Sequence, residues 1–238
     1  LDPQFTSGYP QIKVGGRVDL FWSTDWRRDA SGRIVHQAGI PTKNPFESVF
    51  GNKDPNLLVG FINKFSYKNF DLSFSFDARF GGKVYSWTEQ GMWNSGAHPD
   101  SDNKWRYDEV VNKLTNYVGN GVKVVSGEVK FGTYGEILSD TRVFQENDYE
   151  VSYQNYIGKY NENPYDHYAP HNILDATFIK LRELSRNYNI PKHITQKMGM
   201  QGIRVGIIGQ NLWMWAKEFR YSDPDRGSES LNSPSGRY

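Results

Sequence analysis

The sequence of 238 residues contains no cysteine. Disulfide bonds, a thiol nucleophile and metal sites with cysteine ligands are therefore excluded. No apolar run approaches the roughly 20 residues that a membrane-spanning helix needs, which excludes a helical membrane protein but not a transmembrane β-barrel, whose strands are only half apolar. The formal net charge of +1 lacks the basic excess that nucleic-acid-binding surfaces carry, so we expect no nucleic-acid partner.

A secretion signal is also missing at the start of the sequence. The first ten residues, LDPQFTSGYP, have neither a basic n-region nor an apolar h-region. We therefore expect the sequence to begin at a mature or internal position, and it could be a piece of a larger protein.

What the sequence does contain is an unbroken alternation of polar and apolar residues from Asp71 to Phe80. In a strand, successive side chains point to opposite faces of the sheet. One face would carry Leu72, Phe74, Phe76, Ala78 and Phe80, and the other would carry Asp71, Ser73, Ser75, Asp77 and Arg79. The alternation alone leaves open whether the apolar face meets a dry core or lipid.

Five segments are predicted to be long strands, at about 11–24, 56–67, 70–82, 172–190 and 202–217. The short stretch 67–70 predicts a tight turn, so that the second and third segments form a hairpin. Between the fourth and fifth segments, residues 191–201 predict a short helical turn that Pro191 opens and that ends near Gly199.

The remaining connections are long, at 25–55, 83–171 and 218–238. Long and short connections alternate along the chain, so the long ones collect at one end of the strands, as in an outer-membrane barrel. The loop at 83–171 is expected to be folded. It contains a predicted amphipathic helix at 103–119, with Val110, Val111, Leu114, Tyr117 and Val118 on one face, and a hairpin at 122–144 that turns around 132–135.

Several of these stretches resemble the SusC/RagA family of TonB-dependent outer-membrane transporters of the Bacteroidota. They are FSYKNFDLSFSFDARFGGKVYS, ILDATFIKLRELSRNYNIP and IRVGIIGQNLWMWAK, in the order and spacing of the family's C-terminal barrel region. The stretch RDASGRIVHQAGIP resembles an upstream loop of the family, with Arg28 in place of a leucine. The stretch YSDPDRGSESLNSPSGRY resembles the last extracellular loop.

The resemblance implies an all-β fold: antiparallel strands of a large, 22-stranded barrel in the bacterial outer membrane, with long extracellular loops and short periplasmic turns. It also implies an N-terminal plug, energy supplied through TonB, and a SusD-like surface lipoprotein that lids the barrel and binds glycans or, in some members, peptides. The sequence departs from this pattern because it has no plug or TonB-contacting segment, and because it stops where the family continues into a final strand.

Five strands cannot close a barrel, since known barrels begin at about 8 strands. An open edge in hydrocarbon would leave backbone donors and acceptors unpaired, at a cost of several kcal/mol each. We therefore expect the remaining strands to come from other chains or from other segments of a longer protein.

Aromatic residues favour the membrane interpretation. Trp213 and Trp215 share a face near the loop-side end of the last strand, whereas Tyr67, Phe70 and Tyr188 lie at the short-turn end. Two aromatic levels separated by apolar strand are typical of the interfacial girdles of outer-membrane barrels. Ordinary core packing in a soluble β-protein is the alternative.

On the membrane interpretation, we expect Leu72, Phe74, Phe76 and Phe80 to face membrane lipid. Asp71, Asp77 and Arg79 would face the lumen, as solvated wall residues first and as substrate contacts second. The loop residues Trp26, Trp93 and Trp105 are candidate contacts to a substrate or partner, together with tyrosines at 153, 156, 160, 165 and 168. The same rings could form the loop's own core, and the sequence leaves both alternatives open.

Catalysis has little support in the sequence. The histidines form no HExxH pair, and His167 and His171 beside Asp166 lack the third or fourth ligand of a metal site. Asp100, Asp102 and Asn103 resemble half of a calcium loop without its glycine and glutamate, so a polar turn is favoured. A glycoside hydrolase would need two carboxylates about 5–9.5 Å apart, and nothing in the sequence pairs them. We expect no catalytic residue, no cofactor and no metal.

The function predicted is TonB-dependent uptake of a nutrient across the outer membrane, most often an oligosaccharide, as part of a SusC-like transporter with a SusD-like lid. The alternative is a soluble β-rich module that binds glycans through its loop aromatics.

Overall fold

The computed structural model describes residues 16–133, 135–161 and 169–225. It divides the chain into two compact units. Unit 1 holds the described residues up to Lys53 and those from Lys83 to Leu174, and unit 2 holds Asp54–Gly82 and Asp175–Asp225. In the described part of the chain, no helix is both long enough and apolar enough to cross a membrane.

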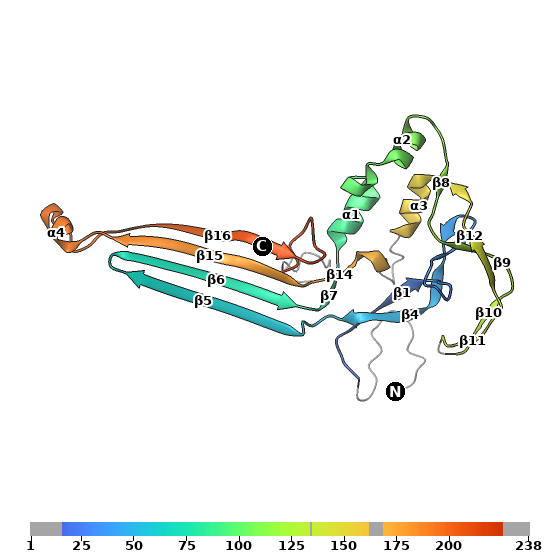
Figure 1. Cartoon of the computed structure of the whole chain (residues 1–238), viewed down its shortest axis with the longest axis horizontal. Coiled ribbons are helices and arrows are strands. Elements are labelled where there is room, and N and C mark those ends of the chain that lie inside the picture. The colour runs from blue at the N-terminus through green and yellow to red at the C-terminus, as the bar shows by residue number, and fades with distance from the viewer. Residues whose placement is uncertain (1–15, 134, 162–168, 226–238) are drawn as a thin grey trace. The chain divides into compact units, whose positions relative to one another are not determined.

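Unit 2 is a sheet of four long antiparallel strands (Figure 1). In spatial order they are β5 (Leu57–Tyr67), β6 (Phe70–Phe80), β15 (Phe178–Asn189) and β16 (Arg204–Ala216). A short helical connection, α4 (Lys192–Thr195) and η3 (Gln196–Met198), joins the last two strands. It ends at Gly199 in the left-handed conformation, as the sequence predicts.

The hairpin expected around 67–70 is confirmed, because Tyr67 pairs with Phe70 across a two-residue turn. The strands expected at 56–67, 70–82 and 202–217 are present with bounds shifted by two residues at most. The strand expected at 172–190 is divided into β14 (Ile173–Asp175) and β15. The break lies where the side chain of Asp175 accepts hydrogen bonds from the backbone and hydroxyl of Thr177.

A β-bulge interrupts β15 at Arg182. Leu181 pairs with Phe76 and Glu183 pairs with Ser75, so Arg182 is an extra residue relative to β6. A bulge of this kind places two consecutive side chains on one face. The opposing strand β16 adapts at Asn211, which has a φ of 50°, a conformation that asparagine tolerates better than most residues.

Unit 1 contains shorter strands. They are β1 (Leu20–Trp26), β2 (Val35–Gln37), β3 (Ile40–Pro41), β4 (Lys43–Asn52), β7 (Lys83–Tyr85), β8 (Tyr117–Val118), β9 (Val122–Ser126), β10 (Val129–Phe131), β11 (Ile137–Asp140), β12 (Val143–Glu146) and β13 (Glu150–Val151). Its helices are α1 (Trp87–Ser95), η1 (Pro99–Ser101), α2 (Lys104–Val110), α3 (Tyr153–Tyr160) and η2 (Pro170–Asn172).

The start of the chain differs from the prediction. Of the strand expected at 11–24, residues 11–15 lie outside the described ranges, and the described strand is β1. The segment 25–55 is not a simple loop, because β4 runs back along β1 as its antiparallel partner. Phe50 of β4 packs against a buried cluster of Phe21, Tyr85 and Ile173, which explains why this polar-looking segment forms a strand.

The described parts of the segment 83–171 are folded, as expected, but the helix in it is shorter than predicted. The helix α2 ends at Val110, and Lys113 has a φ of 60°, which is incompatible with a continuing helix. Tyr117 belongs instead to β8, which pairs with β13. The hairpin expected at 122–144 is confirmed, with β10 paired to β11 and β9 paired to β12.

Candidate functional site

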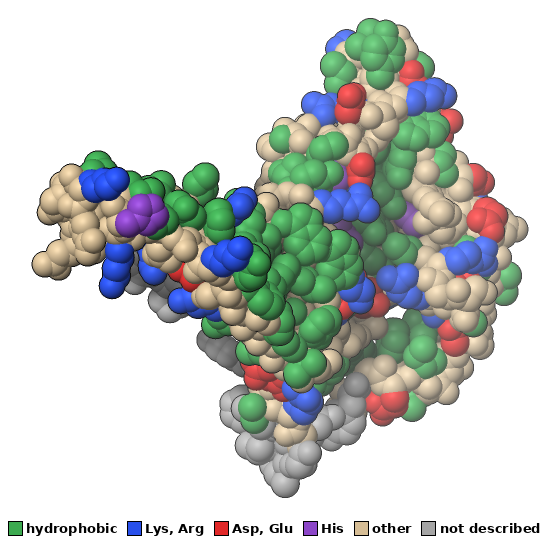
Figure 2. Space-filling view, turned by 60° about the vertical axis from the view of Figure 1, so that its left-hand side comes forward, with side chains coloured by type: hydrophobic (Ala, Val, Ile, Leu, Met, Phe, Trp, Pro, Cys, Tyr) green, Lys and Arg blue, Asp and Glu red, His purple; other side chains and the backbone are tan. Residues whose placement is uncertain are grey.

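The sheet of unit 2 has two chemically different faces. Leu72, Phe74, Phe76, Ala78 and Phe80 share one face of β6, and their cross-strand partners include Phe65, Phe61 and Val59 on β5 and Leu184, Leu181 and Ile179 on β15. Many of these side chains are exposed, and Ile207 on β16 is 80% exposed. Hydrophobic side chains gather on this sheet in Figure 2. The apolar surface is therefore uncovered in unit 2 itself.

Aromatic rings are concentrated on the apolar face. Phe74 lies 6.0 Å from both Phe61 and Phe65, measured between ring centroids. At the short-turn end, Phe70 packs on Tyr188 at 4.7 Å. Near the other end, Trp213 pairs with Leu181 and Trp215 pairs with Ile179, and both tryptophans are about half exposed. The register thus places aromatic residues at two levels of one face.

The opposite face carries a row of hydrogen-bonded polar side chains. Ser73 and Ser185 join their hydroxyl groups at 2.6 Å across β6 and β15. The carboxylate of Asp71 accepts hydrogen bonds from Ser66 at 2.6 Å and from Asn189 at 3.1 Å. Arg79 donates to the backbone oxygen of Gly81 at 3.3 Å. Asp71 and Arg79 each therefore have hydrogen-bond partners within unit 2. Their assignment to a lumen wall stays a prediction.

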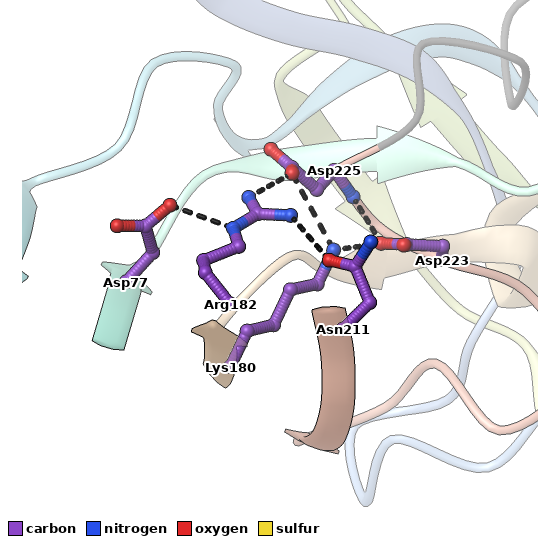
Figure 3. Close-up of polar contacts among 6 residues, drawn as sticks. All are labelled: Asp77, Lys180, Arg182, Asn211, Asp223 and Asp225. Carbon is purple, nitrogen blue, oxygen red and sulfur yellow. Dashed lines mark hydrogen bonds and ion pairs between the residues drawn. The ribbon is translucent and has the colours of Figure 1, made fainter. Parts of the chain in front are cut away.

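A charge network lies at the loop-side end of the polar face (Figure 3). Arg182, at the bulge, donates from Nε to Asp77 at 2.7 Å and also pairs with Asp225. Lys180 is 3% exposed and pairs with Asp223, and its Nζ lies 3.4 Å from Asp225. Two cations of β15 thus bind two carboxylates that follow β16.

This network attaches residues 217–225, which we call the return segment, to β15. The backbone nitrogen of Lys217 donates to the oxygen of Thr177 at 3.0 Å, and Phe219 is buried. Glu218 accepts a hydrogen bond from the backbone of Asp175 at 2.5 Å. Burial raises the pKa of Asp225, but its hydrogen bond to Arg182 and the nearby charge of Lys180 outweigh burial and leave the pKa below its usual value. The return segment is therefore fixed to the strands of unit 2 by backbone hydrogen bonds and by ion pairs.

Sequence reasoning identified Asp77 but missed its partner Arg182 and the other members of the network, Lys180, Asp223 and Asp225. A signal was present, because Arg182 and Glu183 are adjacent polar residues that break the alternation of β15. Such a slip in phase is what a bulge produces when one face is buried or apolar. The approach of the return segment had no comparable signal.

The candidate contact Trp26 is packed inside unit 1. Its ring is 3% exposed and stacks on Tyr160 at 5.3 Å. Tyr156 and Tyr153 are buried as well, and both contact Tyr117. These rings therefore form part of the core of unit 1, which was the alternative to a role in ligand contact. Trp26 offers no free face to a ligand. The tyrosines at 165 and 168 lie outside the described ranges.

Trp93 and Trp105 are partly exposed. Trp93 stacks on His98 at 4.1 Å and lines a cavity of about 530 Å³. The wall of this cavity also includes Tyr153, Arg106 and Glu109, from α2 and α3. Trp105 packs edge-on against Tyr117 at 5.7 Å. An aromatic ring beside polar groups is a combination found in sites for small polar ligands.

Of the described histidines of unit 1, His36 and His98 are buried and His171 is half-buried. Burial lowers the pKa of His171 to about 4, with a further contribution from His98, and its Nε2 contacts Asn161 at 2.5 Å. In the described ranges, no three side chains of the histidine, aspartate or glutamate type are grouped to hold a metal ion. Asp166 and His167 lie outside those ranges, so the expectation of no metal site stays a prediction.

Comparison with known proteins gives the following similarities. No protein-family model matches the chain. TonB-dependent receptor P3 of Formosa agariphila is 24% identical over 187 residues, which cover 78% of this chain and 14% of the receptor. TonB-dependent receptor P26 of the same organism is 25% identical over 258 residues, which cover 98% of this chain and 22% of that receptor. These relatives confirm the resemblance to TonB-dependent receptors, and the chain spans less than a quarter of their length.

Solved structures of the RagAB peptide importer are also similar. The closed-closed state has a TM-score of 0.47 at 15% identity and covers 86% of this chain and 20% of the solved chain. The open-open state has the same score and identity and covers 96% and 22%.

Proposed function

We propose that this chain forms part of the wall and the extracellular loops of a TonB-dependent outer-membrane transporter of the SusC/RagA type, which takes up a nutrient. The similarity to two curated TonB-dependent receptors is the premise. The observation that carries the proposal is the sheet of unit 2, with an exposed apolar face on one side and a hydrogen-bonded polar face on the other.

The apolar face has the properties of a lipid contact. Leu72, Phe74, Phe76 and Phe80 lie on it, and Trp213 and Trp215 lie on the same face toward the loop-side end. Transmembrane barrels carry an outward apolar band with aromatic girdles at the two interfaces. We therefore assign this face to lipid and the two tryptophans to one girdle.

The polar face has the properties of a water-filled interior. Its polar side chains hydrogen-bond across strands. Asp71, Ser73 and Asn189 remain partly exposed, as lumen-facing residues of barrels are, whereas Ser185 is buried. The outer edges of β5 and β16 have no neighbouring strand among the described residues. In hydrocarbon each such edge must pair with another strand, so we propose that both edges continue into the rest of a barrel of about 22 strands.

The substrate and partners are proposed on the resemblance in the sequence. We propose an oligosaccharide as the nutrient, with a peptide as the alternative, a SusD-like lipoprotein as the lid, and TonB as the source of energy. Unit 1 would then form the extracellular loops, and the cavity beside Trp93 would contact the nutrient or the lid. No catalytic residue takes part in this function.

The alternative of a soluble glycan-binding module would require the apolar face to be covered by another part of the protein. Contiguous exposed apolar patches larger than a few hundred Å² are rare on soluble monomers. Exposed apolar side chains lie on this face at both edge strands, with Phe61 on β5 and Ile207 and Trp213 on β16. This observation favours the membrane proposal.

The test compares neighbouring positions on the two faces of β6. Phe74→Arg places a charge on the apolar face, whereas Ser75→Arg places the same charge on the polar face next to Glu183. A lipid-facing arginine near the bilayer midplane costs roughly 2–4 kcal/mol. We expect Phe74→Arg to reduce the amount of assembled full-length protein in outer-membrane fractions, and Ser75→Arg to leave it near the parental level.

Phe74→Leu is the control for lost packing, because Phe74 also contacts Phe61 and Phe65. We expect this variant to assemble. Equal assembly of the two arginine variants would contradict the assignment of the faces, and a stable, detergent-free monomer with cooperative unfolding would favour the soluble alternative.

A further inference from the structure

Arg27 in unit 1 has no ion-pair partner among the described residues. It follows β1, and its Nε atom is buried without a hydrogen-bond partner among the residues that the structure describes. Its near neighbours differ, since Arg28 pairs with Asp25 and Arg33 pairs with Asp29. A buried donor that is left unsatisfied is costly, so its presence needs an explanation.

The backbone of Arg27 is fixed on both sides by the surrounding sheet. Its nitrogen donates to the oxygen of Thr42 at 2.7 Å, and its oxygen accepts from the nitrogen of Val35 at 2.8 Å. Val35 belongs to β2, which pairs in parallel with β9. The base of the Arg27 side chain is therefore held in place before any ligand arrives, which lowers the entropic cost of binding.

Arg27 lines a cavity of about 530 Å³. Lys123 from β9 and Arg142, which directly precedes β12, line the same cavity, but both are paired: Lys123 with Asp148 at 2.5 Å, and Arg142 with Asp140 at 2.7 Å. Glu128 also lines it, and its carboxylate pairs with Lys130 at 3.1 Å. The charges of these ion pairs largely cancel, so the cavity carries the positive charge of Arg27.

The remaining wall offers contacts to an uncharged portion of a ligand. Tyr149 is about half exposed, and Gln37 and Thr42 provide polar groups. His36 lies at the wall as a neutral ring, because burial lowers its pKa. The volume falls within the range of about 300–1,000 Å³ that small-molecule sites occupy.

We propose that this cavity binds a carboxylate of the imported nutrient, with Arg27 as its charged partner. A guanidinium group presents two parallel N–H donors that match the two oxygens of a carboxylate. The carboxylate can belong to a uronic-acid sugar or to the C-terminus of a short peptide, which share this chemistry. The inference rests on the proposed function only for the statement that the ligand is a nutrient.

The experiment is calorimetric titration of the full-length protein in detergent with four probes. They are trigalacturonic acid, its methyl ester, trialanine and trialanine amide. The members of each pair differ in the carboxylate alone, and comparing the two acids distinguishes a sugar from a peptide source. We expect at least one acid to bind, and its ester or amide to bind at least about tenfold more weakly, the lower end of what a charge-assisted hydrogen bond provides.

The variants Arg27→Gln and Arg28→Gln form a matched pair. Both remove one positive charge, but Arg28 pairs with Asp25 and donates to the oxygen of Gly32, and it is not part of the cavity wall. We expect Arg27→Gln to weaken the Kd for the acid at least about tenfold and Arg28→Gln to change it less than twofold. Arg27→Lys keeps the positive charge but lacks the two parallel N–H donors of the guanidinium group, so its Kd for the acid should lie between those of the parent and of Arg27→Gln.

Three outcomes would each overturn the proposal. They are no binding of either acid, equal affinity for an acid and its neutral partner, and an unchanged Kd for the acid in Arg27→Gln. Circular dichroism of each variant shows whether it is folded, and Arg27→Lys keeps the test valid if Arg27→Gln does not fold. Assembly of the Phe74 and Ser75 variants is measured separately. A protein that assembles in the membrane but binds no acid therefore contradicts this inference and leaves the proposed function intact.

Discussion

Replacing Lys180 with methionine should release the return segment from the polar face of unit 2. Lys180 is almost fully buried and pairs with Asp223, with Asp225 also within 3.4 Å. Methionine fills a similar volume but provides no positive charge. The two carboxylates then face the sheet without their buried cation, although Arg182 still pairs with Asp225.

The size of the effect follows from the exposure of the partners. Removing one member of a fully buried ion pair costs about 3–5 kcal/mol. Here the side chains of Asp223 and Asp225 are 31% and 39% exposed, so water can solvate part of the charge that is left. We therefore expect about 1.5–3 kcal/mol, the value of hydrogen bonds to charged groups. This corresponds to an increase of about 10- to 150-fold in the population of the detached segment.

Trypsin cleavage after Arg220 measures this population, because Arg220 is exposed and lies within the return segment. When opening and closing are fast relative to cleavage, the rate follows the open population. The rate is measured by mass spectrometry on the full-length protein in detergent. Lys180→Arg, which keeps the charge, should raise the rate much less than Lys180→Met.

Lys197→Met is the matched control, since it makes the same chemical change at an exposed site in η3. Its cleavage rate after Arg220 should equal that of the parent. A rate for Lys180→Met within twofold of the parent would refute the role of this ion pair, and an equal increase in both methionine variants would show a general loss of stability instead.

Two further predictions concern unit 1. The pKa of His171 is lowered to about 4 by burial, with a contribution from His98, so the unfolded state binds more protons below about pH 6.5 and the free energy of unfolding should fall from pH 6.5 toward pH 4. His171→Gln should make this dependence shallower in chemical unfolding experiments, and an unchanged slope would contradict the assignment. Gly121 has a φ of 150°, and a Cβ there would lie 2.2 Å from the oxygen of Ile34, whereas a Cβ at Gly91 in α1 meets nothing within 4 Å. Gly121→Ala should therefore lower the unfolding midpoint by the equivalent of about 1–3 kcal/mol, while Gly91→Ala should raise it by about 0.5–1 kcal/mol; a similar change in both would argue against the close contact.

The long strands of unit 2 could be predicted because they are two-faced. A period of two residues over 71–80 fixes which side chains share a face, and the turn at 67–70 fixes the partner of that strand. The pairing of β6 with β15 joins segments about a hundred residues apart. It follows the chain order of the predicted strands, as expected for an up-and-down antiparallel sheet.

Unit 1 was harder to predict, because its short elements are determined by contacts distant in sequence. Val110, Val111 and Leu114 have helical spacing, but α2 ends at Val110, and Tyr117 packs instead against Tyr153 and Tyr156. The aromatic rings gave no local signal of whether they would be buried. Trp26 is packed by Tyr160, which is more than a hundred residues away, and periodicity cannot register such a contact.

The bulge at Arg182 links the part of the fold that could be predicted to the part that could not. In a regular strand Leu181 and Leu184 would lie on opposite faces, because they are three positions apart, and Glu183 would share the apolar face with Leu181. With the bulge, Arg182 and Glu183 both lie on the polar face, where Arg182 binds Asp77. Leu184 then returns to the apolar face. The same irregularity brings Arg182 to Asp225. One extra residue in β15 therefore keeps a charge off the apolar face and also provides an anchor for the return segment.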